Sequence, residues 1–174
     1  RAQAVAVLEQ ASLRNPANME LLGAYGRAMA DAGDLNQALA VLGRSHTPDN
    51  PDWRILNAQG AVLDQLGRHA EAQRHYSSAL KIVPDEPSVL SNLGLSYALM
   101  KELKRAEITL RRALAQPNAD PKVRQNLALV LGLPWVWGAG PKAVALYAGA
   151  AALTIAARRV LRRRRPAPAP TSRE

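Results

Sequence analysis

Small residues recur in this chain at a fixed offset of 34 positions, and this period constrains the fold more than any other feature. Three series hold a small residue in every copy: Gly26, Gly60 and Gly94; Ala38, Ala72 and Ala106; Ser45, Ala79 and Ala113. Around them, apolar residues follow at spacings of three and four, as on one face of an α-helix. Because Gly or Ala lets two helix backbones approach closely, the period predicts a row of similar helix pairs.

A 34-residue period with two fixed small positions and a closing Pro, such as Pro84, is typical of tetratricopeptide repeat (TPR) helix pairs. We therefore predict an all-α fold, a TPR α-solenoid of antiparallel helix pairs wound into a right-handed superhelix. The predicted units are a half repeat at 1–16, full repeats at about 18–51, 52–84 and 86–118, and a partial repeat or capping helix at 120–132. The apolar face of the half repeat is expected to be partly uncovered, because each repeat buries its face only against neighbours.

The turns within the pairs carry their own signals. Gly33 and Gly67 are expected to end the first helices of their repeats, and Asp34 offers an N-cap oxygen to the helix that follows. Lys101 stands at the equivalent position of the third repeat, a departure from the Gly pattern. Pro87 fits the first turn of a helix, with Asp85 or Glu86 available to accept amide hydrogen bonds.

The formal net charge of +9 at pH 7 is concentrated outside the repeats. Residues 1–132 hold 15 Lys and Arg against 13 Asp and Glu, whereas residues 133–174 hold 8 against 1. A nucleic-acid groove needs basic side chains spread along a face that follows phosphates. The repeat body lacks such a distribution, so the sequence does not favour nucleic-acid binding.

At Leu133 the repeat register fails, and the composition shifts to Ala, Arg, Gly and Pro over residues 133–174. Residues 143–157 form an uncharged apolar run, within a predicted short helix at 143–161, and this run is shorter than the roughly 20 residues of a membrane helix. Three interpretations stay open: a short anchor with arginines on the cytoplasmic side, a basic segment on anionic lipid, and a disordered end without function. The last is favoured.

The sequence offers no sign of catalysis. Cysteine is absent, and the three histidines, His46, His69 and His75, are not spaced as metal ligands on one helix face. No phosphate loop, nucleophile elbow or zinc-protease motif occurs. We therefore expect no catalytic residue, metal or cofactor, and we expect the histidines to be exposed on helices.

The surface most suited to binding is the groove that first helices line in a TPR array. Counting outward-facing positions in each repeat predicts the following partner-binding residues: Arg27, Asp31, Arg54, Asn57, Asp64, Ser91, Asn92, Leu95, Lys122, Gln125 and Asn126, with Glu20, Gln65, Ser88 and Leu99 beside them. Asn92 and Asn126 are 34 apart, so their amides could hold a peptide backbone with a donor and an acceptor. The alternative is that these are only solvated helix residues. Repeat packing is assigned to Gly26, Ala38, Gly60, Ala72, Gly94 and Ala106.

Two stretches resemble a particular family. SNLGLSYALMKELKRAEITLRRALAQPNADPKVRQNLALVLGL (91–133) and DNPDWRILNAQGAVLDQLGRHAEAQRHYSSALKI (49–82) are similar to the TPR proteins of the tight-adherence (Flp/Tad) pilus assembly system, the D component of that locus (TadD). The resemblance covers residues 1–133 and implies an exported lipoprotein that helps assemble the outer-membrane secretin of a type IV-like pilus machine. Its lipid-bearing Cys would lie upstream of Arg1.

After Leu133 the chain departs from the family, which usually completes a fourth repeat with a second helix. The tail is then a lineage-specific end, a membrane anchor, or the product of a reading-frame shift in GC-rich DNA. The resulting hypothesis is a non-catalytic, periplasmic or outer-membrane-associated adaptor in Flp/Tad pilus assembly and secretion. It would bind a protein or peptide, such as the secretin, in its groove. The alternatives are a generic cytosolic TPR scaffold and a TPR protein anchored to a membrane through 143–157.

Overall fold

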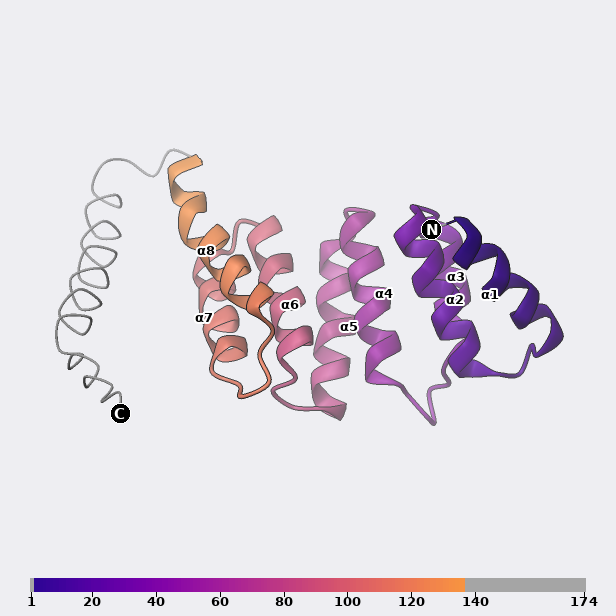
Figure 1. Ribbon diagram of the computed structural model, residues 1–174. Coiled ribbons are helices and arrows are strands. Elements are labelled where there is room, and N and C mark those ends of the chain that lie inside the picture. Colours follow the sequence, from indigo (N-terminus) through magenta and orange to yellow (C-terminus); the bar gives the residue numbers. More distant parts are fainter. Residues whose placement is uncertain (1, 137–174) are drawn as a thin grey trace, which may run out of the picture. The chain divides into compact units, whose positions relative to one another are not determined.

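The computed structural model describes residues 2–136, with side-chain environments to residue 132. This part of the chain contains eight helices and no β-strand (Figure 1). The helices are α1 (Ala2–Arg14), α2 (Met19–Ala32), α3 (Leu35–Gly43), α4 (Trp53–Gln65), α5 (His69–Ile82), α6 (Pro87–Leu99), α7 (Leu103–Leu114) and α8 (Pro121–Val136). The all-α helical repeat solenoid predicted from the period is thereby confirmed.

Helices pair in the order of the chain. α2 packs on α3, α4 on α5, and α6 on α7, each pair joined by a short turn (Figure 1). Neighbouring pairs contact through α3 with α4 and α5 with α6, and α1 packs on α2. The first helices also meet directly, since α2 contacts α4 and α4 contacts α6. Residues up to Val130 form one compact unit, and this unit carries the groove.

Each first helix begins at an acid or amide side chain, and these four residues are themselves 34 positions apart. The Asn18 side chain accepts a hydrogen bond from the backbone N–H of Leu21. In the same way, Asp52 accepts from the backbone N–H of Arg54, Glu86 from that of Ser88, and Asp120 from that of Lys122. Such caps satisfy amides that a helix start leaves without an internal partner. The repeat therefore specifies where its first helix begins.

The ends of the first helices follow the same period. Gly33, Gly67 and Lys101 all have left-handed backbone angles, with φ of 95°, 75° and 63°. Glycine adopts this conformation without steric cost, whereas the side chain of Lys101 makes the same conformation sterically unfavourable. Asp34 occupies the N-cap position as predicted, but its side chain makes no capping hydrogen bond.

The small positions lie where the two helices of a pair approach most closely. A Cβ atom added at Gly26 would lie 2.7 Å from Leu42 Cγ, one at Gly60 would lie 2.5 Å from Tyr76 Cε1, and one at Gly94 would lie 2.6 Å from Leu110 Cγ. The three opposing residues are also 34 positions apart, so each Gly accommodates one large side chain from the second helix. Ala38, Ala72 and Ala106 are fully buried beside these contacts.

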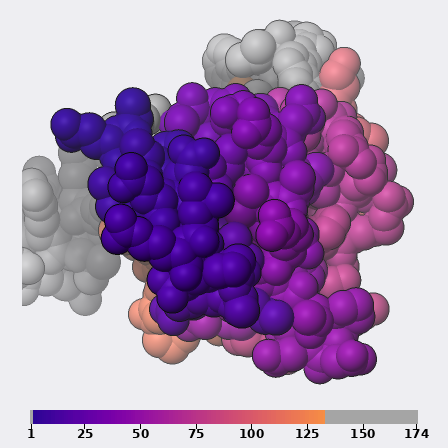
Figure 2. Space-filling model, turned by 90° about the vertical axis from the view of Figure 1, so that its right-hand side faces the viewer, coloured from indigo at the N-terminus to yellow at the C-terminus, as the bar shows by residue number. Residues whose placement is uncertain are grey.

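At the outer helices the packing is incomplete among the described residues. The α1 end of the array, in indigo in Figure 2, has Val7 and Leu13 largely exposed, as expected for an isolated second helix. In α8, Ala128 corresponds to Gly94 by the period. It is exposed, and the described residues include no helix after α8 that could cover it.

The predicted tail helix at 143–161 lies outside the described residues. Within residues 2–136, no helix is both long and apolar enough to span a bilayer. The predicted domain limits within 133–174 stay predictions.

Replacing Gly60 tests the close contact in the central pair. We expect Gly60→Ala to lower the free energy of unfolding by about 1–3 kcal/mol, because its methyl group would overlap the buried Tyr76 ring. Gly60→Leu should lower it further. Gly43→Ala is the control, since its Cβ would lie 3.9 Å from the nearest atom, Gln59 Nε2. Urea unfolding monitored by circular dichroism measures the free energy of unfolding of all three variants. Equal stability of the Gly60 and Gly43 variants would contradict the packing assignment.

Candidate partner-binding groove

The first helices present their open faces on one side of the array, and the face between α2 and α4 is hollowed. This hollow has a volume of about 410 Å³. Its lining combines apolar and polar residues: Ala30, Trp53, Ala58, Ala61 and Val62, with Arg27, Asp31, Arg54, Asn57, Gln65 and Ser88. Four predicted binding residues, Arg27, Asp31, Arg54 and Asn57, therefore lie together in one concavity.

A second hollow of about 760 Å³ adjoins the first. It extends over the start of α2, the start of α4 and the loop between α3 and α4. Arg27, Trp53 and Arg54 line both hollows, so positive charge and the indole lie where the two meet. The Arg54 guanidinium lies over the Trp53 ring, 4.7 Å from its centroid, which holds the charged group in place. Trp53 was not among the predicted site residues.

Further along the array, the groove floor is connected by side-chain hydrogen bonds between successive first helices. Asn92 of α6 donates from Nδ2 to Asn57 Oδ1 of α4 at 3.0 Å. Asn126 of α8 donates from Nδ2 to Ser91 Oγ of α6 at 2.9 Å. The amides predicted to hold a peptide thus already bond within the array. A primary amide has two N–H donors and an acceptor oxygen, so each keeps capacity for a further bond.

The remaining predicted residues divide by exposure. Lys122 and Gln125 of α8 are exposed, and Leu95 of α6 is half-buried. Ser91 is only 6% exposed, so it belongs to the floor and does not face outward as predicted. Whether the exposed residues bind a partner stays a prediction.

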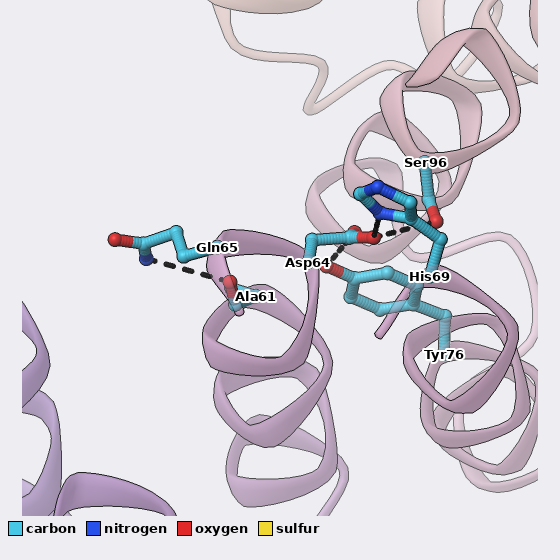
Figure 3. A network of polar contacts seen from close by, with 6 residues as sticks. All are labelled: Ala61, Asp64, Gln65, His69, Tyr76 and Ser96. Carbon is cyan, nitrogen blue, oxygen red and sulfur yellow. Dashed lines mark hydrogen bonds and ion pairs between the residues drawn. The ribbon is translucent and has the colours of Figure 1, made fainter. Parts of the chain in front are cut away.

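Asp64 also departs from its predicted place, because it faces away from the groove. Figure 3 shows its carboxylate directed toward α5 and α6, while Gln65, the next residue, points to the opposite side of α4. Asp64 accepts hydrogen bonds from Tyr76 Oη at 2.9 Å and Ser96 Oγ at 2.8 Å, and His69 Nδ1 lies 2.8 Å from Oδ1. Burial, with the neighbouring Asp64 charge, raises the pKa of Tyr76, so the phenol stays a donor. We call these four residues the Asp64 cluster.

The Asp64 cluster is confined to the contact between the second and third pairs. One period earlier and one period later, apolar residues occupy every one of its positions: Ala30, Leu35, Leu42 and Val62 before it, and Ala98, Leu103, Leu110 and Val130 after it. Four positions that are apolar in the neighbouring repeats are therefore all polar at this one contact. A buried polar group costs free energy unless it is hydrogen-bonded, which explains why the set changes as a whole.

The combination of Asp, His and Ser does not form a catalytic triad. In a triad the imidazole lies between the serine and the carboxylate. Here Ser96 and His69 both bond Asp64, and Ser96 is fully buried. The cluster is consequently structural.

The histidines differ from the exposed residues that the sequence suggested. His69 belongs to the Asp64 cluster, and His46 and His75 are half-buried. Burial, together with nearby His46, lowers the pKa of His75. Among the described residues, no three His, Cys, Asp or Glu side chains come together as a potential metal site.

Fold and groove together define an α-helical repeat protein with an open, mixed polar and apolar concave face. A tetratricopeptide-repeat family profile matches residues 1–60 and 65–130. This chain therefore belongs to the tetratricopeptide-repeat family, whose members are typically protein-interaction modules without enzymatic activity.

Two relatives show partial similarity. The chain is 27% identical over 128 residues to the BBSome complex member BBS4 of Bos taurus, covering 74% of the chain and 25% of that protein. It is 36% identical over 87 residues to the uncharacterized protein y4yS of Sinorhizobium fredii, covering 49% of the chain and 47% of that protein. The chain thus spans a quarter and about half of these two proteins.

Solved structures share the fold. The Sgt2 TPR domain of Aspergillus fumigatus aligns with a TM-score of 0.64 and 19% identity, covering 72% of this chain and 85% of that one. PcrH of Pseudomonas aeruginosa aligns with a TM-score of 0.58 and 24% identity, covering 64% and 90%. PcrH has also been solved in complex with the chaperone binding region of PopB. At these identities the likeness shows the fold alone.

Substitutions in the Asp64 cluster test its collective character. Tyr76→Phe should lower the free energy of unfolding by about 1–3 kcal/mol, because Asp64 loses a buried donor. Tyr97→Phe is the control, since the Tyr97 hydroxyl bonds Arg105 at an exposed position.

The complete exchange of the cluster to the residues of the preceding repeat should behave differently. Asp64→Ala, His69→Leu, Tyr76→Leu and Ser96→Val together should be less destabilising than the sum of the four single changes, because no polar group is left unpaired. Chemical denaturation of the four single variants and the combined variant gives the free energies of unfolding to be compared. Simple additivity would show that the four residues contribute independently.

Proposed function

We propose that this chain is a non-catalytic adaptor that binds a protein or peptide partner in the groove of its first helices. The observation that carries the proposal is the pair of hollows on α2 and α4, which meet at Arg27, Trp53 and Arg54. An aromatic residue beside an arginine is a frequent energetic centre of protein interfaces. The PcrH complex with a region of PopB supports the proposal at the level of the fold.

The proposed setting is Flp/Tad pilus assembly and secretion, on the periplasmic side of the outer membrane. The resemblance of residues 49–82 and 91–133 to the TPR proteins of that system supports it. The partner would be the secretin or another assembly component. A cytosolic scaffold without an envelope role is the alternative.

Charge reversal at the junction of the hollows tests the adaptor role. Arg27→Glu with Arg54→Glu should weaken binding of the purified chain to its pilus-assembly partner at least tenfold, which corresponds to about 1.4 kcal/mol. Arg74→Glu with Arg111→Glu is the matched control, because these exposed arginines lie on the second helices α5 and α7. Titration calorimetry against each purified component gives the affinities. Equal losses in the two double variants would contradict binding in the groove.

The setting has a separate test in the gene. Sequencing upstream of Arg1, across the codons after Leu131 and into the neighbouring genes should reveal a lipobox Cys and pilus-assembly neighbours. Fractionation of the source cells should then place the protein with the outer membrane. An intact frame without an export signal and with unrelated neighbours would favour the cytosolic scaffold.

A further inference from the structure

A small hollow of about 210 Å³ lies between the second helices α1 and α3. Its lining includes one residue from each of three successive helices: Ser12 of α1, Tyr25 of α2 and Val41 of α3. One period later, these three positions are taken by His46, Gln59 and His75. The period therefore predicts that two imidazoles and one amide come together between α3 and α5.

The contacts of these residues agree with the predicted placement. Gln59 extends from α4 toward the end of α3, where its Nε2 lies 3.9 Å from the position that a Cβ atom of Gly43 would occupy. His46 follows Gly43 by three residues, in the loop after α3. Burial lowers the pKa of His75, and the nearby His46 lowers it further. The loop after α3, α4 and α5 thus each contribute one side chain to a common site, which we call the histidine crevice.

Two buried atoms of the histidine crevice, His46 Nδ1 and Gln59 Oε1, have no hydrogen-bond partner among the residues that the structure describes. Gln59 is only 6% exposed, so bulk water does not solvate its amide freely. A buried polar atom without a partner costs free energy, and in a folded protein it calls for an explanation such as a bound ion. One period later the three positions hold no imidazole and no amide: Leu80, Leu93 and Thr109.

The chemistry of these atoms favours a transition-metal ion over other cations. Imidazole is the commonest metal-binding side chain and suits Zn²⁺, Ni²⁺ and Cu²⁺, whereas Ca²⁺ and Mg²⁺ prefer oxygen ligands. The lowered pKa of His75 keeps its ring in the neutral form that binds a metal. Glu71, one turn before His75, is held by Arg68 at 2.7 Å, so its charge is already compensated.

We propose that the histidine crevice binds one divalent transition-metal ion between His46, His75 and Gln59. His46 Nδ1 and Gln59 Oε1 then gain the partner that they lack, and water completes the coordination. Because the third ligand is an amide oxygen, the site agrees with the absence of three clustered His, Cys, Asp or Glu side chains in the described part of the chain.

The position of the histidine crevice gives such an ion both access and a role. His46 also lines the second hollow, which offers a path from solvent. An ion held by the loop after α3 and by α4 and α5 joins the first helix pair to the second, and so stabilises their contact. This inference goes beyond the adaptor function and does not rest on it.

Zinc titration of the full chain, expressed without a histidine tag, tests the proposal. The sequence has three histidines and no cysteine, so few other side chains compete for the ion. Calorimetry should detect one Zn²⁺ per chain and no binding of Mg²⁺. His46→Ala and His75→Ala should each weaken Zn²⁺ binding by roughly tenfold or more, because loss of a ligand costs at least as much as loss of a supporting residue.

The third histidine and the amide supply the matched variants. His69→Gln is the control, since His69 bonds Asp64 in a separate cluster, and it should bind Zn²⁺ as the unaltered chain does. Gln59→Glu should bind Zn²⁺ more tightly, because a carboxylate oxygen is a stronger ligand for a cation than an amide oxygen. Addition of Zn²⁺ should also raise the melting temperature of the unaltered chain, because an ion that binds only the folded state stabilises it.

Nitrogen NMR of the imidazoles decides the question even if the alanine variants fail to fold. In the unaltered chain, Zn²⁺ should shift the ring resonances of His46 and His75 and leave those of His69 in place. Absence of Zn²⁺ binding, an affinity unchanged in both alanine variants, or an equal shift at His69 would overturn the proposal. The unpartnered atoms of the crevice would then be bonded to water instead.

Discussion

The described array depends on one recurring contact, in which a glycine of the first helix accommodates a large side chain of the second. Gly26, Gly60 and Gly94 each leave too little space for a methyl group, and the opposing residues are Leu42, Tyr76 and Leu110. Helices this close fix the geometry of each pair, and repetition every 34 residues aligns the pairs. The aligned first helices then form a continuous floor, which is the condition for any groove.

The Asp64 cluster shows that the pairs are not interchangeable. It replaces a fully apolar set of side chains at one contact only, between the second and third pairs. Buried polar networks add little net stability compared with apolar packing, but they penalise any alternative pairing that leaves a group without its partner. If the contacts between helix pairs were apolar throughout, a pair could also pack against the pair one repeat further along. A single polar contact at the centre of the array disfavours that shift, because Asp64 would then meet Leu and Val side chains.

The period allowed the fold to be predicted from the sequence, because glycines, alanines and inward leucines repeat where the backbone requires them. The groove face could be predicted only in part. Counting positions placed Arg27, Arg54 and Asn57 correctly on the open face, since a helix of known phase has one outward side. It misplaced Asp64, whose position borders the next pair, and the outcome depends on the partners Tyr76 and Ser96 offered there. It also missed Trp53, since an aromatic residue at a helix start fits a core and a binding surface equally well. Distances between helices, which decide these cases, are not contained in a one-dimensional pattern.

The period also separates the residues that stabilise the array from those available for recognition. Outside the Asp64 cluster and the histidine crevice, positions that face the partner helix keep their character in every repeat, because any change there costs packing. Positions on the open face carry no such constraint, and there Arg, Ala and Leu succeed one another at a single site of the repeat. A solenoid can therefore vary its groove one helix at a time without altering its backbone. Arg27, Ala61, Leu95 and Leu129, which occupy one line of equivalent positions, are such a variation.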